Sequence, residues 1–254
     1  VDQNKALSSY IKGGRLGVEN HAAPSILRDF GDLEPLEWIC GDHHQFDLFI
    51  YDEQARAVYR PWLTAWEDLA TRADVGYIIC RQPNSRTIAQ ALQHALEDDG
   101  KDRHYGVPKN VYIDNGKDYR SYYISGDTWK YKHLERPEFD VKTRSVCAEL
   151  GTEVTYALPF KGRSKPVERF FETLENQLVE HLPGFCGHTI DKRPTHELMQ
   201  QIRNRQLLTL EEFKVAYSEW LDEYHEKPHR GRGMDGLSPN EMWDRHERNG
   251  WGPT

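Results

Sequence analysis

The chain has 254 residues, with 33 Lys and Arg against 41 Asp and Glu, which gives a formal net charge of −8. Its hydrophobic fraction of 37% is enough for a buried core and excludes global disorder. No run of about 18 apolar residues is present, so we expect no membrane-spanning segment. The acidic balance is unusual for a chain that binds DNA strongly by itself, because DNA-binding domains usually carry a basic surface.

The cysteines and the first residue add two smaller expectations. The four cysteines are widely spaced and form no CxxC pair, so we expect reduced thiols and no cysteine-based zinc site. The chain begins with Val1 and has no apolar signal core near its start. We therefore expect a part of a longer protein that acts in the cytoplasm.

The first half of the chain predicts strands followed by a helix. Residues 1–35 form a polar lead-in, and residues 36–52 predict a strand. Within this strand, alternate residues share one face by the period of two, beginning with Trp38, Cys40, Asp42 and His44. The pattern then predicts two more strands within 60–82, joined by a turn near 71–74, and a helix over 85–98 capped by Ser85.

The second half alternates strands and helices. The short apolar run 111–113 predicts a buried strand that ends at Asp114, before the turn-forming Asn115 and Gly116. Residues 117–142 have no clear period and are interpreted as an insertion. A short helix near 145–150 and a short strand near 152–157 come next.

The clearest helix signal covers residues 164–182. Its apolar stripe has helical spacing, and Pro166 suits the first turn. After a loop rich in Gly, Pro and His, a long helix is predicted within 208–228 and a short one within 238–246.

This order of elements predicts an α/β fold. Three consecutive strands favour an antiparallel meander, and the later strands favour parallel crossovers, giving a mixed five-stranded sheet flanked by helices. We divide the chain into a lead-in (1–35), a core (36–184, with the insertion at about 117–142) and a helical C-terminal extension (185–254).

Three carboxylates stand where this topology would bring them together. Asp42 lies within the first strand, Asp114 at the carboxyl end of the fourth, and Glu168 in the first turn of the amphipathic helix. Phosphoryl transfer on DNA needs an activated oxygen nucleophile and a stabilised leaving oxygen, and two hard cations about 3.5–4 Å apart supply both. Such cations prefer oxygen ligands. The pattern by itself is weak, because most acidic residues are surface groups.

Several neighbouring residues compete for roles at this site. Glu172, one helical turn after Glu168, is the main rival third ligand, and Asp118 is a rival for Asp114. Asp47 is separated from Asp42 by an odd number of positions and is expected on the opposite, solvent-facing side of the strand. The pair His43 and His44 suggests metal binding, but a supporting or surface role is favoured, because no second His pair has suitable spacing.

The segments around the three carboxylates resemble the signature segments of the bacteriophage Mu-type transposases. These segments are GDHHQFDLF around Asp42, VYIDNGK around Asp114 and KPVERFF around Glu168. The resemblance covers roughly residues 24–245 and extends to the larger DDE family of transposases and retroviral integrases. It implies an RNase H-like fold, Mg²⁺ or Mn²⁺ as cofactor in a two-ion site, and nicking followed by strand transfer, with Asp42, Asp114 and Glu168 as catalytic metal ligands.

Basic residues crowd the segment before and within the amphipathic helix. Lys161, Arg163, Lys165 and Arg169 are the candidate DNA-binding residues. Lys165 either contacts a DNA phosphate or offsets the charge of Glu168, and the sequence favours neither role. The resemblance further implies transposon-end and target DNA as partners, a homo-oligomer on DNA, and an ATP-dependent target-delivery protein in a bacterial host cytoplasm.

Two other functions stay open at this point. The same fold would serve an RNase H-like nuclease or resolvase, and a transposase-derived chain can also act as a non-catalytic DNA-binding assembly module. The amphipathic helix and the long segment after it favour a transposase over a nuclease. The three intact carboxylates argue against a non-catalytic module.

Overall fold

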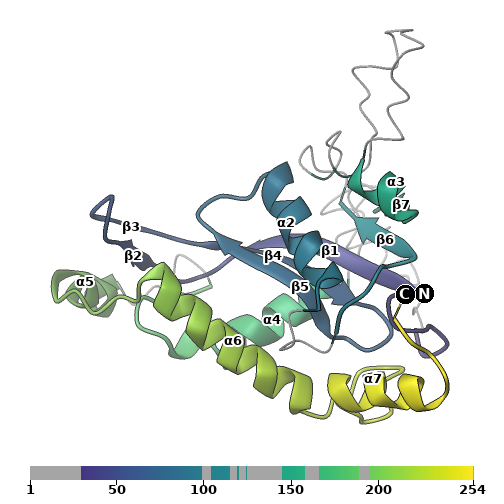
Figure 1. Ribbon diagram of the computed structural model, residues 1–254. Helices are drawn as coiled ribbons and strands as arrows, with labels where there is room; N and C mark the ends of the chain where they lie inside the picture. Colours follow the sequence, from purple (N-terminus) through teal and green to yellow (C-terminus); the bar gives the residue numbers. More distant parts are fainter. Residues whose placement is uncertain are drawn as a thin grey trace, which may run out of the picture.

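A five-stranded mixed sheet forms the centre of the computed structural model (Figure 1). The structure describes residues 30–98, 104–114, 119, 124, 145–157, 166–188 and 195–253. The strand order is β5-β4-β1-β6-β7. The strands β1, β4 and β5 pair antiparallel, and β6 and β7 continue the sheet in parallel from β1. Their bounds are β1 (Trp38–Gln45), β4 (Trp62–Asp68), β5 (Asp74–Cys80), β6 (Asn110–Ile113) and β7 (Glu153–Tyr156).

Helices cover both faces of this sheet (Figure 1). One face carries α2 (Ser85–Leu96) and α3 (Val146–Leu150), and the other carries α4 (Val167–Gln177) and α6 (Leu210–Glu226). The remaining elements are η3 (Val179–His181), α5 (Thr195–Arg203) and α7 (Pro239–Arg248). The predicted five-stranded mixed sheet flanked by helices is confirmed, and its architecture is compatible with the expected RNase H-like fold.

The sheet separates two apolar cores. On the α4 face, α4 and α6 pack aromatic side chains such as Phe170 and Tyr217 against residues of β1 and β4. On the α2 face, Trp66 of β4 is fully buried among residues of α2, β6 and α7. A Cβ atom at Gly41 would lie 2.6 Å from the Trp66 ring, so a glycine is needed at this point of β1. The position directly before Asp42 is thereby fixed by core packing.

The structure corrects the predicted first strand. The expected strand over 36–52 ends at Gln45 and is followed by a separate hairpin of β2 (Ile50–Asp52) and β3 (Ala57–Tyr59). Beyond Gln45 the backbone no longer pairs with β4 along the sheet. The N–H of Phe49 donates to the carbonyl of Gly184, and the N–H of Tyr51 donates to that of Leu208. These partners are distant in the sequence, so no local pattern signals the change of direction.

The predicted helices are found, but α4 ends at Gln177 and is shorter than the predicted range 164–182, and two further details differ. The N-cap of α2 is Asn84, not Ser85, because the Asn84 side chain accepts hydrogen bonds from the N–H groups of Arg86 and Thr87. The helix α5 lies in a segment that was interpreted as a loop.

Several expectations fall partly or wholly outside the described residues. The expectations for the lead-in before residue 30 and for nearly all of the insertion at 117–142 lie outside the described residues. The boundary between 184 and 185 stays a prediction, although α6 contributes to the same core as β1. All four cysteines are free thiols, and no helix in the described ranges is both long and apolar enough to cross a membrane.

Two adjacent acidic residues of β4 are buried in this fold. Glu67 is 3% exposed, and burial raises its pKa to about 7, although the charges of Arg72 and Arg169 act in the opposite direction. Burial likewise raises the pKa of Asp68 to about 6. Its carboxylate nevertheless accepts hydrogen bonds from Thr71 and from the N–H of Leu36. Glu67 is therefore a candidate source of pH-dependent stability.

We predict that Glu67→Gln stabilises the fold at pH 8. Between the unfolded pKa of 4.5 and the folded value of about 7, the folded state binds more protons, so the free energy of unfolding falls as pH rises. A shift of this size corresponds to at most about 3 kcal/mol, and the gain should shrink as pH falls toward 4.5. Urea unfolding at pH 5 and pH 8 measures both values. Glu172→Gln, on the exposed side of α4, is the matched control. A Glu67→Gln protein less stable than wild type at pH 8 would contradict the prediction.

Candidate functional site

The parallel pairing of β1 with β6 ends two residues before Asp42 and Asp114. The two strands run parallel, and the last pair in their register is Cys40 opposite Tyr112. Asp42 lies two residues after Cys40, and Asp114 lies two residues after Tyr112. Because side chains alternate along a strand, Asp42 shares the face of Cys40, which is the face covered by α4. The same alternation, continued one residue past the end of β6, predicts that Asp114 shares the face of Tyr112. Neighbouring strands are about 4.8 Å apart, so this register brings the two acids to one edge of the sheet.

The helix α4 is held against β1 by specific contacts. The His44 ring stacks on Phe171 with centroids 4.9 Å apart, and His44 Nε2 lies 2.6 Å from Glu175 Oε1. The backbone N–H of Asp47 donates to the same Glu175 oxygen at 3.1 Å. His44 of β1 thus meets both Phe171 and Glu175, and Asp47, two residues beyond β1, meets only Glu175 among these, so the chain leaving β1 and the helix α4 run in the same direction.

This shared direction places Glu168 at the Asp42 end of the contact. Glu168 precedes Phe171 by three residues and lies on the same side of α4. Asp42 precedes His44 by two residues on the same face of β1. Glu168 is exposed in the first turn of α4, where the helix dipole favours a negative charge. Asp42 is half-buried, and its Oδ1 accepts a hydrogen bond from the His43 N–H at 2.9 Å.

The three carboxylates do not form one closed cluster. Their ligand atoms do not all lie within 4.8 Å of one another, the spacing at which three side chains would share one ion. A two-ion site does not require this spacing, because two ions about 3.5–4 Å apart divide the ligands between them. The strand pairing and the contacts of α4 favour a convergence of the three residues, and both this convergence and their role as metal ligands stay predictions. The donor set, which consists of carboxylate oxygens, suits Mg²⁺ or Mn²⁺.

The candidate DNA-binding residues are described only in part. Arg169 is exposed in the first turn of α4, next to Glu168. Lys161, Arg163 and Lys165 lie outside the described residues, so their predicted role is untested. The rival ligand Glu172 is exposed, whereas Asp118 also lies outside the described residues.

The two histidines have supporting roles, as expected, and neither stands alone at the surface. His44 connects β1 to α4 through Phe171 and Glu175. One nitrogen of His43 lies 2.8 Å from the hydroxyl of Thr64 in the neighbouring strand β4. Both side chains therefore stabilise the sheet segment that carries Asp42.

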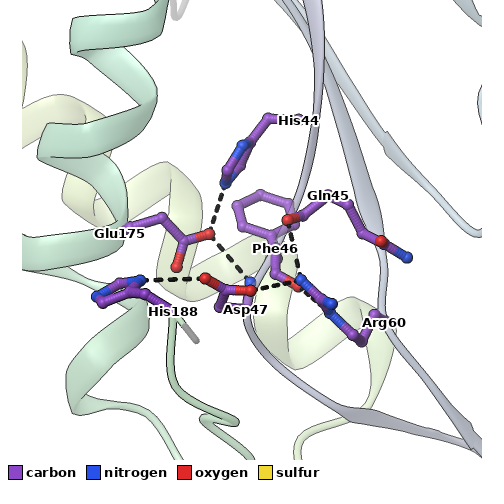
Figure 2. Close-up of polar contacts among 7 residues, drawn as sticks. All are labelled: His44, Gln45, Phe46, Asp47, Arg60, Glu175 and His188. Carbon is purple, nitrogen blue, oxygen red and sulfur yellow. Dashed lines mark hydrogen bonds and ion pairs between the residues drawn. The ribbon is translucent and has the colours of Figure 1, made fainter. Parts of the chain in front are cut away.

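Sequence reasoning missed a second polar cluster beyond the end of β1 (Figure 2). Asp47 was expected on the solvent-facing side of the strand, which is wrong: it is half-buried and contacts Arg60 and His188. The alternation fails because β1 has already ended at Gln45. Glu175 is 5% exposed. One sequence signal could have predicted this burial, because Glu175 lies one turn after Phe171 on the apolar side of α4.

Comparison with known proteins identifies the family. Residues 41–184, more than half of the chain, match the family model of the TnsB C-terminal domain. The chain is 30% identical over 150 residues to the transposase for transposon Tn552 of Staphylococcus aureus, covering 58% of this chain and 27% of that protein. It is 26% identical over 183 residues to the Mu-like prophage FluMu transposase A of Haemophilus influenzae, covering 68% of this chain and 25% of that protein.

The match has defined limits in both proteins. The chain spans about a quarter of the length of each of these two relatives. The matched region includes Asp42, Asp114 and Glu168, together with β6, α4 and β1 from Gly41 onward. The resemblance in the sequence is thus confirmed, and the chain belongs to the family of the TnsB C-terminal domain, among the Mu-type transposases.

Proposed function

We propose that this chain is the catalytic core of a DNA transposase that nicks transposon ends and transfers the cut strand into target DNA. The observation that supports the proposal is the arrangement of three elements: β1 pairs in parallel with β6, and α4 contacts β1 through His44. In this arrangement we propose that Asp42, Asp114 and Glu168 converge. The relatives, both transposases by name, support this chemistry over that of a general nuclease.

The proposed site uses Asp42, Asp114 and Glu168 to hold two Mg²⁺ or Mn²⁺ ions. When bound, such ions lower the pKa of a coordinated water or hydroxyl and stabilise charge on the leaving oxygen. The chain itself supplies the fixed orientation. In this proposal, the pairing of β1 with β6 would orient Asp42 and Asp114, and the contacts of His44 with Phe171 and Glu175 would orient Glu168 through α4.

The same site would accept DNA from the solvent side. Asp114 and Glu168 are exposed and Asp42 is half-buried, so the carboxylate edge is open to a large substrate. Arg169, exposed beside Glu168, is positioned to contact a backbone phosphate, with Lys161, Arg163 and Lys165 as further proposed contacts. From the resemblance alone, we also propose a homo-oligomer that bridges two transposon ends and an ATP-dependent target-delivery partner.

We predict that Asp42→Asn, Asp114→Asn and Glu168→Gln each abolish nicking and strand transfer while the fold survives. Each change removes a charged ligand at nearly constant shape. A loss of several kcal/mol of transition-state stabilisation reduces the rate about 10³-fold or more. Nicking of supercoiled plasmid and strand transfer of transposon-end DNA, both in Mn²⁺ and in Mg²⁺, measure the effect, and circular dichroism verifies folding.

The matched control for Glu168→Gln is Glu172→Gln. Glu172 lies one turn further along α4, is exposed, and receives the same substitution. We expect its activity to stay close to that of wild type. Wild-type turnover in any of the three site variants would remove that residue from the proposed site. Nicking without strand transfer by the wild-type chain would favour the nuclease function, and a lack of both would favour a non-catalytic module.

A further prediction concerns DNA affinity. With a net charge of −8, the chain should bind plain duplex DNA weakly, with a Kd on the order of 10⁻⁴–10⁻⁶ M at physiological salt, and more weakly as salt rises. Fluorescence anisotropy across a salt series measures this dependence. Arg169→Ala should reduce the salt slope by about one, while Arg248→Ala, exposed at the end of α7, should not. Tight, sequence-specific binding at physiological salt would place the recognition surface elsewhere on this chain.

A further inference from the structure

The polar cluster beyond β1 joins three separate parts of the fold (Figure 2). Asp47 follows β1, Glu175 lies in α4, and His188 lies in the segment after η3. The three offer ligand atoms that all lie within 4.8 Å of one another. His188 Nδ1 and Asp47 Oδ2 are 3.0 Å apart, and the other Asp47 oxygen accepts a hydrogen bond from Arg60 at 2.5 Å.

One carboxylate oxygen in this cluster has no partner. Glu175 is 5% exposed, and its Oε1 accepts hydrogen bonds from His44 and from the Asp47 N–H. Its Oε2 is buried and has no hydrogen-bond partner. Figure 2 shows that this second oxygen points toward the contact between Asp47 and His188. A buried carboxylate oxygen without a partner costs free energy, and a cation within reach of it would remove that cost.

The charges nearby leave room for a cation. Asp47 and Glu175 each contribute one carboxylate. Arg60 pairs with Oδ1 of Asp47, so that Oδ2 of Asp47 faces His188. Arg60 offsets one negative charge and does not reach Glu175 in the contacts of this cluster. An ion between Asp47 Oδ2, Glu175 Oε2 and His188 Nδ1 would replace the present hydrogen bond between Asp47 and His188.

We propose that Asp47, Glu175 and His188 form a second metal site, separate from Asp42, Asp114 and Glu168. Two carboxylates and one imidazole suit a divalent transition ion such as Zn²⁺ or Mn²⁺ better than Mg²⁺, which prefers oxygen ligands and water. The His188 side chain is 39% exposed, which gives the ion a path from solvent and leaves a coordination position for water.

The ion would have a structural effect on the proposed active site. One oxygen of Glu175 contacts His44 and the Asp47 N–H, and the other oxygen would bind the ion. The ion would therefore hold α4 against the end of β1. Glu168 lies at the other end of α4, in its first turn, and Asp42 lies earlier in β1. The site itself does not depend on the proposed catalytic function, because its ligands and its test are independent of DNA.

The test measures binding of Zn²⁺ and of Mn²⁺ by the chelator-treated full chain, using isothermal titration calorimetry and, for Mn²⁺, electron paramagnetic resonance. The background is the Asp42→Asn/Glu168→Gln double variant, in which the proposed catalytic site is disabled. In this background we expect one bound ion, with at least about 10-fold weaker affinity after His188→Ala. The control His181→Ala removes another exposed histidine seven residues earlier and should leave the affinity unchanged.

The outcomes separate this proposal from the proposed function. Loss of binding in His188→Ala but not in His181→Ala supports the site, whatever the nicking activity of the wild-type chain. Absence of both ions in the background variant, or equal affinity in the two histidine variants, overturns it. Binding of Zn²⁺ alone that survives His188→Ala would also overturn it and would assign the ion to thiolates such as Cys186, since Mn²⁺ does not favour sulfur ligands.

Discussion

The buried carboxylate of Glu175 is the contact on which the proposed active site depends. It accepts hydrogen bonds from the His44 ring and from the Asp47 backbone N–H, and it thereby sets the position of α4 along β1. Hydrogen bonds to a charged, buried acceptor are stronger than neutral ones and are costly to break. If α4 were displaced by one turn, Glu172 and not Glu168 would lie at the Asp42 end. In the proposed site, the choice of Glu168 as the third carboxylate therefore depends on Glu175, which lies two turns further along α4.

The centre of the sheet provides the second constraint. Strand β1 is flanked by an antiparallel partner, β4, and a parallel partner, β6, so its position is fixed from both sides. Gly41 has no side chain that would collide with Trp66, so β1 can pack closely against the core on the α2 face. Asp42 therefore stands on a strand that is paired on both sides and Asp114 directly follows β6, whereas the position of Glu168 depends on helix packing.

The sequence predicted those elements that carry their own periodic signal. Alternation identified β1, the short apolar run identified β6, and the apolar stripe identified α4. The strand β6 ends at Ile113, one residue before the predicted end at Asp114. The β2–β3 hairpin was missed, because it forms backbone bonds with segments far away in the sequence. Buried charges were also missed. Glu67, Asp68 and Glu175 are enclosed by tertiary partners, and composition alone treats an acidic residue as a surface group.

The most direct test of the central claim is a crystal structure with Mn²⁺, using its anomalous signal. The account predicts an anomalous peak about 2 to 2.5 Å from carboxylate oxygens of Asp42 and Asp114, with Glu168 completing the ligands at this edge of the sheet. A peak coordinated by Glu172 in place of Glu168 would contradict the register of α4 on β1. The absence of any peak at Asp42 and Asp114, with Mn²⁺ bound elsewhere on the chain, would contradict the proposed catalytic site as a whole.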